Sequence, residues 1–249
     1  MPLLRCLGLM LAVWLVAGPA HAAEPSVGDA LVGVASDAAP EAASMSVRLV
    51  LTLTALTLLP GVILAMTPFT RFIIVFSLLR QALGLQQSPP NQVLIGLSLV
   101  LTMTVMQPTT QKAWSEGIHP FISGQASIEE SYPKAMGPMR SFMLKNVARD
   151  DLAAAMKLAR QARPETLDDI PTPVVVTGFV LSELRTAFTI AVKVYLPFLV
   201  VDLVVASVLL GMGMMMLPPV VVSLPFKLLV FVLMDGWGLL VAGMVGGIR

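Results

Sequence analysis

Six charged residues occur in the otherwise apolar stretch from residue 174 to residue 247, and their chemistry needs an explanation. Each would cost about 2.5 to 3.5 kcal/mol in the middle of a membrane if it had no partner. Such groups can form a proton or ion relay, but equal numbers of acids and bases favour salt bridges between helices or subunits. The sequence therefore favours buried charges that are paired, or that lie in a wet or subunit-facing environment. The six residues are Glu183, Arg185, Lys193, Asp202, Lys227 and Asp235.

Other kinds of reactive site have little support in the sequence. The two histidines, His21 and His119, are too few for a metal site of nitrogen ligands or for a Ser-His-Asp triad. A glycine-rich phosphate-binding loop and a nucleophile elbow are both absent. Adjacent acids at 150–151 and 168–169 are more typical of helix caps or solvated surfaces than of catalysis. The sequence predicts no enzyme, no catalytic residue, no metal site and no cofactor.

Three consecutive methionines, Met214, Met215 and Met216, occur inside the last apolar stretch. Methionine is unbranched and polarizable, so a row of three can fill an irregular gap and still yield when something passes. Glycine permits a break in a helix and proline prevents its continuation, so the methionines are expected on a loop between two helices. Packing against lipid or core is the simpler alternative. The residues that bound the loop are Gly211, Gly213, Pro218 and Pro219.

The composition is that of a membrane protein. Of 249 residues, 56% are hydrophobic and only 12% are charged, and the mean hydropathy is +0.84. The formal net charge is +1, so no strong positive field would attract nucleic acid.

Residues 1–22 resemble a cleaved export signal. Arg5 precedes a short apolar run, and small residues before Ala22 predict cleavage between Ala22 and Ala23. An uncleaved first membrane helix is the competing interpretation, but the run is short for a span of about 20 residues. Cleavage would remove Cys6, which is the single cysteine.

Four regions follow the signal. Residues 23–45 lack periodicity and predict a flexible segment. Residues 46–111 form a first apolar helical region. Residues 112–172 hold eight basic and eight acidic residues, about half of all the charges, and predict a polar, periplasm-facing helical segment. Residues 173–249 predict a second apolar helical hairpin region that contains the methionine loop.

Within these regions the pattern predicts an all-α fold. The first apolar region divides into stretches at 46–66, 69–85 and 93–106, with Asn91 as a helix cap before the third. An amphipathic helix or helix pair is expected at 139–161. Prolines at 197, 218–219 and 225 predict breaks in the last region, which leaves helices at 174–196, 197–217 and 224–245. Hydropathy alone predicts four membrane spans, with Arg71 and Arg80 on the cytoplasmic side.

Two long stretches resemble a known family. LPGVILAMTPFTRFIIVFSLLRQALGLQQSPPNQVLIGLSLVLT begins at Leu59, and LSELRTAFTIAVKVYLPFLVVDLVVASVLLGMGMMMLPPVVVSLPFKLLVFVLMDGW begins at Leu181. Both are similar to the FliP/SctR family of type III secretion export-gate proteins. The resemblance as a whole covers about three quarters of the mature chain. The segments YLPFLVVD, GMGMMMLPP and SLPFKL are its most specific parts.

The resemblance implies a function that composition and spacing do not show. It implies a core subunit of the flagellar export gate, in which several copies, five in the family's known assembly, form a ring with FliQ and FliR. The ring lies in the inner membrane and the flagellar basal body beside other export-gate proteins, and its cargo is unfolded flagellar protein. In the family much of the ring is lifted toward the periplasm. The resemblance assigns Met214, Met215 and Met216 to a pore gasket, and Glu183 and Lys227 to a salt bridge between subunits.

Two other functions fit parts of the sequence. A proton-coupled secondary transporter of a small solute would use Glu183 and Asp202 as titrating groups in a self-contained unit. A purely structural membrane scaffold would give the methionines no role in permeability. The size of the assembled complex separates the transporter from the ring.

Overall fold

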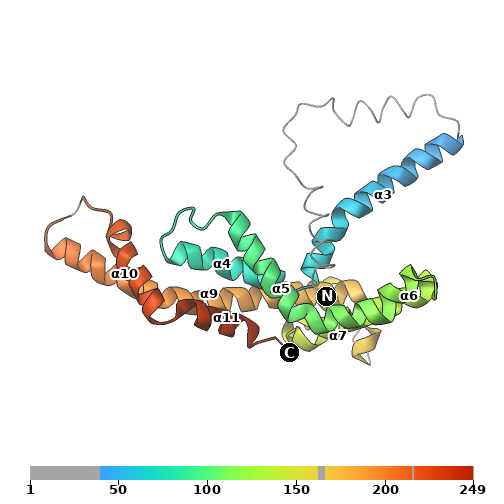
Figure 1. Ribbon diagram of the computed structural model, residues 1–249. Coiled ribbons are helices and arrows are strands. Elements are labelled where there is room, and N and C mark those ends of the chain that lie inside the picture. Colours follow the sequence, from blue (N-terminus) through green and yellow to red (C-terminus); the bar gives the residue numbers. More distant parts are fainter. Residues whose placement is uncertain (1–39, 162–165, 215, 249) are drawn as a thin grey trace. The chain divides into compact units, whose positions relative to one another are not determined.

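The computed structural model describes residues 40–161, 166–214 and 216–248, and within these ranges it contains helices and turns and no strand (Figure 1). The predicted all-α fold is confirmed. Two short irregular turns, the π-helical η1 (Trp114–Ile118) and the 3-10 helix η2 (Leu167–Asp169), accompany the α-helices. In chain order the α-helices are α3 (Pro40–Ala65), α4 (Phe69–Ala82), α5 (Asn91–Ala113), α6 (His119–Ile122), α7 (Ile128–Asn146), α8 (Arg149–Leu158), α9 (Thr172–Gly211), α10 (Pro219–Leu233) and α11 (Gly236–Val245).

The chain divides into two compact units, Met1–Thr57 and Leu58–Arg249. Helix α3 begins at Pro40, inside the segment 23–45 that was expected to be flexible, while the rest of that segment, 23–39, and the predicted cleavage site at Ala22 and Ala23 lie outside the described residues. The second unit holds the apolar core and the charged residues discussed below.

Three described helical segments are long and apolar enough to cross a membrane: Val47–Ala65, Asn91–Ile122 and Thr172–Gly211. The pair α10 and α11 would add a fourth if the two are counted as one span, although they are bent by 65°. Helix α4 has 14 residues, so at 1.5 Å per residue it is too short for a hydrocarbon layer of about 30 Å. The expected count of four is thus an upper limit.

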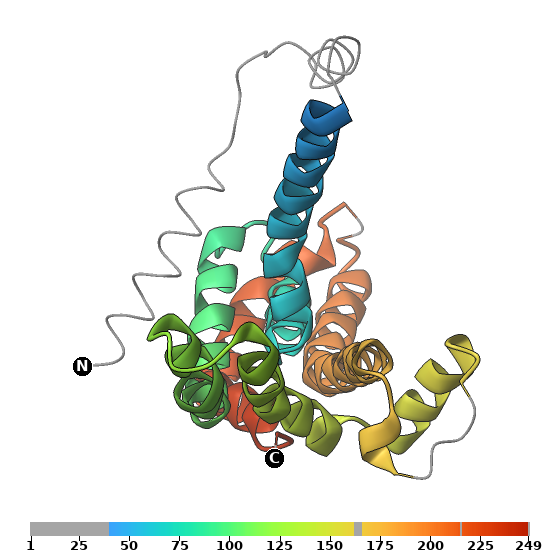
Figure 2. The same ribbon diagram turned by 90° about the vertical axis from the view of Figure 1, so that its right-hand side faces the viewer.

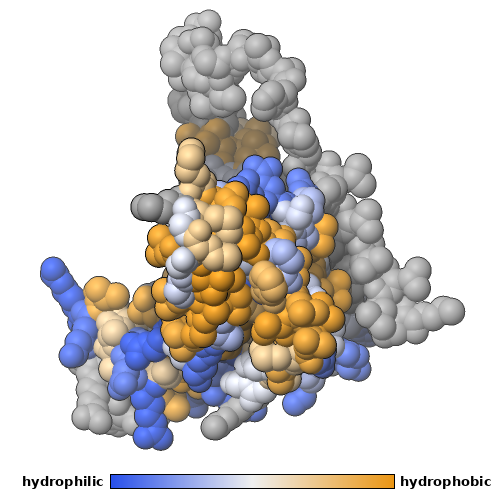
Figure 3. Space-filling view, turned by 90° about the vertical axis from the view of Figure 1, so that its left-hand side faces the viewer, coloured by the Kyte–Doolittle hydropathy of each residue, from blue (hydrophilic) through white to orange (hydrophobic). Residues whose placement is uncertain are grey.

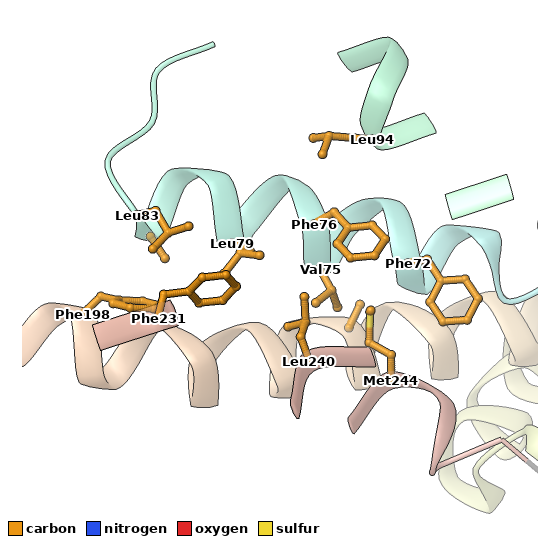
Figure 4. Packing of buried hydrophobic residues seen from close by; sticks show 12 residues of the cluster. Phe72, Val75, Phe76, Leu79, Leu83, Leu94, Phe198, Phe231, Leu240 and Met244 are labelled. Carbon is orange, nitrogen blue, oxygen red and sulfur yellow. The ribbon is translucent and has the colours of Figure 1, made fainter. Parts of the chain in front are cut away.

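The main apolar core is built on α4. Its buried residues Phe72, Val75, Phe76 and Leu79 recur at spacings of three, four and seven, which places them on one helical face. This face packs against α9, α10 and α11 (Figure 4). Aromatic rings of α9 and α10 also pack together in this core, where the ring centroids of Phe198 and Phe231 are 6.3 Å apart.

A second apolar core joins α7 and α8 to the first turns of α9 (Figure 2). Phe142 of α7 and Phe179 of α9 pack edge to face, with ring centroids 5.9 Å apart. The predicted amphipathic segment 139–161 is confirmed as a helix pair, α7 and α8, separated at Val147 and Ala148. The backbone N–H of Ala148 donates a hydrogen bond to Ser182 Oγ at 2.9 Å, which ties this break to α9.

The predicted helix breaks at Pro197 and Pro225 are wrong. Helix α9 runs 40 residues through Pro197, and α10 contains Pro225. A proline removes one backbone hydrogen bond, but in long apolar helices the packing on both sides keeps the axis continuous. The chain instead turns at the methionine loop and at Asp235, whose left-handed backbone (φ 48°) ends one helix and begins the next.

The predicted cap at Asn91 is also wrong. Asn91 lies in the first turn of α5 without a side-chain cap bond, and its Oδ1 instead accepts a hydrogen bond from Arg80 Nη1 at 2.8 Å. Arg80 also donates to the Pro89 carbonyl at 3.1 Å. Arg80, which hydropathy predicted to lie on the cytoplasmic side of the membrane, therefore holds the turn between α4 and α5.

The turn that leads into α9 is held by hydrogen bonds from two sources. Arg140 of α7 donates to the carbonyls of residues 167, 168 and 170 and to Thr172 Oγ1. Thr166 and Asp169 bond reciprocally, and the hydrogen bonds from Thr166 lower the pKa of Asp169. This contribution to stability is present above the unfolded pKa of the carboxyl and is lost as the pH falls through its folded value.

A substitution at Gly117 tests how closely η1 packs on α7. A methyl group at Gly117 would overlap the backbone of Ala135, which cannot move as a side-chain tip can. Gly117→Ala is therefore expected to lower the free energy of unfolding by about 1–3 kcal/mol through overpacking. Gly137→Ala is the matched control, because Gly137 lies in α7 with open space around it. It should be neutral or stabilising by up to about 1 kcal/mol.

Thermal unfolding of both variants in detergent measures the difference. Equal melting temperatures for the Gly117 and Gly137 variants would contradict the close contact between η1 and α7.

Candidate functional site

A buried ion pair joins α4 to α9. Arg71 donates from Nε to Glu183 Oε2 at 2.7 Å and from Nη2 to Glu183 Oε1 at 2.5 Å. The two side chains are 3% and 1% exposed, so the pair is removed from water. A bidentate arginine-carboxylate contact satisfies both oxygens and fixes the orientation of both groups. In a dry environment the pair holds only because each charge has its counter-ion.

The remaining arm of Arg71 reaches a third helix. Its Nη1 donates to the carbonyl of Met244 at 3.1 Å. Met244 belongs to the last turn of α11, where carbonyls lack partners within the helix. Arg71 thus caps α11 while it neutralises Glu183, and a single guanidinium positions α4, α9 and α11 together.

A second buried cation, Lys227 of α10, contacts α9 at a later position than Glu183. Lys227 Nζ of α10 is 2.7 Å from Asp202 Oδ2 and donates to the Ala82 carbonyl, at the end of α4, at 3.0 Å. Ser223 Oγ donates to Asp202 Oδ1 at 2.5 Å. Lys227 is almost fully buried, and Asp202 retains partial exposure. This cluster joins the antiparallel helices α9 and α10 to the end of α4.

The third ion pair links the polar segment to α9. Asp151 lies in the first turn of α8, where a negative charge is favoured by the helix dipole. Its Oδ1 is 2.5 Å from Arg185 Nη2, with the aspartate buried and the arginine exposed. Asp151 Oδ2 is buried and has no hydrogen-bond partner in the described part of the chain.

Four of the six charges singled out in the sequence, Glu183, Arg185, Asp202 and Lys227, are therefore paired within the chain. Glu183 and Lys227 do not pair with each other within one chain, because Arg71 and Asp202 occupy them. A bridge between Glu183 and Lys227 of different copies stays a prediction. Pairing was expected to bury the charges, yet Arg185, Lys193 and Asp235 are exposed and Asp202 is half-buried.

Two functional partners were missed by sequence reasoning. Arg71 is 112 residues from Glu183, and Asp151 lies in the polar segment. Arg71 was interpreted as a cytoplasmic marker of topology. Its position in an apolar block, three residues into a helix, was the signal that could have shown it to be buried.

Lys193 and Asp235 differ from the other four charges. Neither forms an ion pair with any residue in the described ranges. Asp235 serves as the N-cap of α11, where its side chain accepts a hydrogen bond from the Gly238 N–H at 3.4 Å. No group of three or more histidine, cysteine or acidic side chains that could hold a metal ion occurs among the residues with a described position.

The methionine loop joins α9 to α10, as the glycine and proline pattern predicts. Gly211 is the last residue of α9, and Gly213 has φ +76°, which glycine adopts without strain. Pro218 and Pro219 form the N-cap and first position of α10, where a missing N–H costs nothing. The exposed fractions of the two described methionines of the run, Met214 and Met216, are 38% and 98%. Met215 lies outside the described residues.

Exchanging the charges of the buried pair tests its partners. Glu183→Arg alone should destabilise the chain by about 3–5 kcal/mol, because it leaves two buried cations together. Adding Arg71→Glu should restore part of the loss, since a bidentate pair can form again, although the Met244 carbonyl loses its donor. The readouts are the melting temperature in detergent and the yield of assembled complex.

The comparison variant combines Glu183→Arg with Lys227→Glu. It should give no rescue, because Lys227 lies beside Asp202 and the exchange would put two acids together. Rescue by Lys227→Glu and none by Arg71→Glu would contradict the pair within one chain and support the bridge between copies.

Comparison with known proteins places the chain in a family. The family model described as FliP family matches residues 52–244. A protein of Bacillus subtilis named flagellar biosynthetic protein FliP is 47% identical over 214 residues, which are 86% of this chain and 97% of that protein. Proteins of the same name from Caulobacter vibrioides and Pectobacterium carotovorum are 49% and 46% identical, over 80% and 88% of this chain and 75% and 86% of their own lengths. The chain therefore belongs to the FliP family.

Proposed function

We propose that the chain is a core subunit of the flagellar type III protein export gate. Copies of it, five by the resemblance, surround a pore together with FliQ and FliR in the inner membrane and the flagellar basal body. Unfolded flagellar proteins pass through this pore. Membership of the FliP family and the span-length apolar helices support the flagellar and membrane parts of the proposal.

One observation carries the pore itself: the exposed methionine loop. Within a single chain, Met216 is 98% exposed, at the end of a predominantly apolar helical hairpin. A large apolar side chain that is left uncovered at such a position needs a partner. Identical loops from neighbouring copies provide one, since a closed ring brings the same loop to one axis.

The chemistry of methionine suits a seal around a moving chain. Thioether side chains exclude water when they close together, and their free rotation lets them fit any passing sequence. An extended chain or a helix of about 10–12 Å across could pass once they move aside. The chain performs no covalent step in this account, and the energy for transport comes from other components of the apparatus.

The carrier alternative receives less support from the buried charges. A proton-coupled carrier needs a carboxylate that is free to bind and release a proton during its cycle. Glu183 accepts two hydrogen bonds from Arg71, and Asp202 is held by Lys227 and Ser223. Both carboxylates named for that role are therefore engaged in structural contacts.

Replacing Met214, Met215 and Met216 together with alanine tests the seal. The expected result is a complex of normal composition that leaks ions or small solutes, because the short side chains cannot close the opening. Flux of a small dye or of protons across vesicles that contain the purified complex provides the measurement.

Two control variants accompany this test. The triple leucine variant retains apolar volume and should leak less than the alanine variant. Met234→Ala removes a methionine that is 46% exposed but lies outside the loop, so it should not leak. Equal, low permeability in all the variants would argue against a seal at this loop.

The mass of the purified complex separates the gate from the carrier. A ring of several copies with small membrane partners is expected for the gate. A monomer or dimer that transports a solute by itself would rule out the gate.

A further inference from the structure

Lys193 and Asp235 are the two charges of the last apolar region that lack a counter-ion in the described residues. Each of the other four is matched by an opposite charge at 2.7 Å or less. One base and one acid therefore remain. Both side chains are exposed within the single chain, although each belongs to an element that could lie in a membrane.

Lys193 projects from the uncovered face of α9. Residues two apart on a helix point about 200° apart, so Lys193 is opposite to the buried Ala191. The neighbours on its face are apolar and exposed: Val192, Leu196 and Val200. An ammonium group among such side chains would cost about 2.5 to 3.5 kcal/mol in a membrane without a partner. The space-filling view shows the apolar surface gathered at the end where α9 and α10 meet (Figure 3).

Asp235 lies near the level of Lys193 along the α9–α10 hairpin. Asp202 of α9 pairs with Lys227 of α10, and Phe198 of α9 packs on Phe231 of α10. Each step of four residues back along α9 thus corresponds to four residues forward along α10. By the same register the last residue of α10, Leu233, is level with position 196, and Asp235 follows two residues later at the turn.

Lys193 nevertheless points away from α10, the helix that Asp235 follows in the chain. Asp202, which binds α10, is nine residues from Lys193 and therefore about 180° around α9. The body of α9 stands between Lys193 and the side on which α10 packs. A base and an acid that do not pair within one chain can meet in a head-to-tail ring, because each copy then presents the base to the acid of the next.

We propose that Lys193 of one copy forms an ion pair with Asp235 of the neighbouring copy. The inference rests on the proposed function, in which copies of the chain associate around an axis. The pair would neutralise both charges when the apolar face of α9 is covered, and it would select the head-to-tail orientation because the reversed contact brings like charges together. Asp235 can do this and still cap α11, since a carboxylate has acceptor sites to spare.

Cross-linking between two tagged chains locates the pair. One chain carries Lys193→Cys and the other carries Asp235→Cys, both with Cys6→Ser, and they are expressed together with the partner proteins of the gate. A short bis-maleimide, added to the purified complex, is expected to give a product that contains both tags. Leu203→Cys replaces Lys193→Cys in the control, because Leu203 is exposed on the same helix but lies further along it.

The expected yield with Lys193→Cys is about tenfold above the Leu203→Cys control, because neighbouring cysteines have a high effective concentration. A complex of normal mass without the doubly tagged product would overturn the pair and leave the proposed function standing. A product that joins only two chains with the same tag, or only a chain and a different subunit, would also overturn it. Failure of the unmodified chain to form any ring would overturn the proposed function and this inference together.

Charge-removing variants provide a second measurement. Lys193→Gln and Asp235→Asn are suitable because asparagine retains the capping ability of aspartate. Each should reduce the yield of assembled ring, and the double variant should lose no more than the worse single variant. Additive losses would contradict direct pairing.

Discussion

The dry contact between Arg71 and Glu183 is the constraint on which the rest of the second unit depends. Two charges buried in an apolar core are tolerated only as long as both stay in place. The same guanidinium caps α11, so three helices share one charged group. The Lys227 cluster repeats this design at the other end of α4, where a lysine neutralises Asp202 and caps a helix. The relative positions of α4, α9, α10 and α11 follow from these two clusters and from the phenylalanine-rich core between them.

These internal pairs divide α9 into two faces with different tasks. One face carries the core and the paired carboxylates, and the other is apolar, exposed and interrupted by Lys193. The charges that are paired inside the subunit hold its helices together. In the proposed ring, Lys193 and Asp235, which lack an ion-pair partner in the described residues, are left for contacts between subunits. In the proposed ring, the methionine loop and the Lys193 face are two exposed features of the hairpin that another copy would cover.

Apolar blocks and periodicity predicted the helices well, and prolines predicted their ends poorly. The apolar block at 69–85, the amphipathic spacing at 139–161 and the glycines around the methionine run correspond to observed elements. The helix break predicted at Pro197 is wrong because a proline removes only one hydrogen bond, and the rest of a 40-residue helix outweighs that loss. The need for counter-ions could be read from composition. Their identities could not, since Arg71 and Glu183 are brought together only by the tertiary fold, and an asparagine such as Asn91 can serve a neighbouring arginine instead of a helix end.

The central claim is that the methionine loops of several copies converge on one axis. The most direct measurement is a structure of the complete complex with side chains resolved, in which the distance of Met216 from the ring axis can be read. The account predicts that Met214 to Met216 of every copy line the narrowest part of the channel and contact one another. Methionine side chains directed into lipid, or packed inside their own subunit away from the axis, would contradict it.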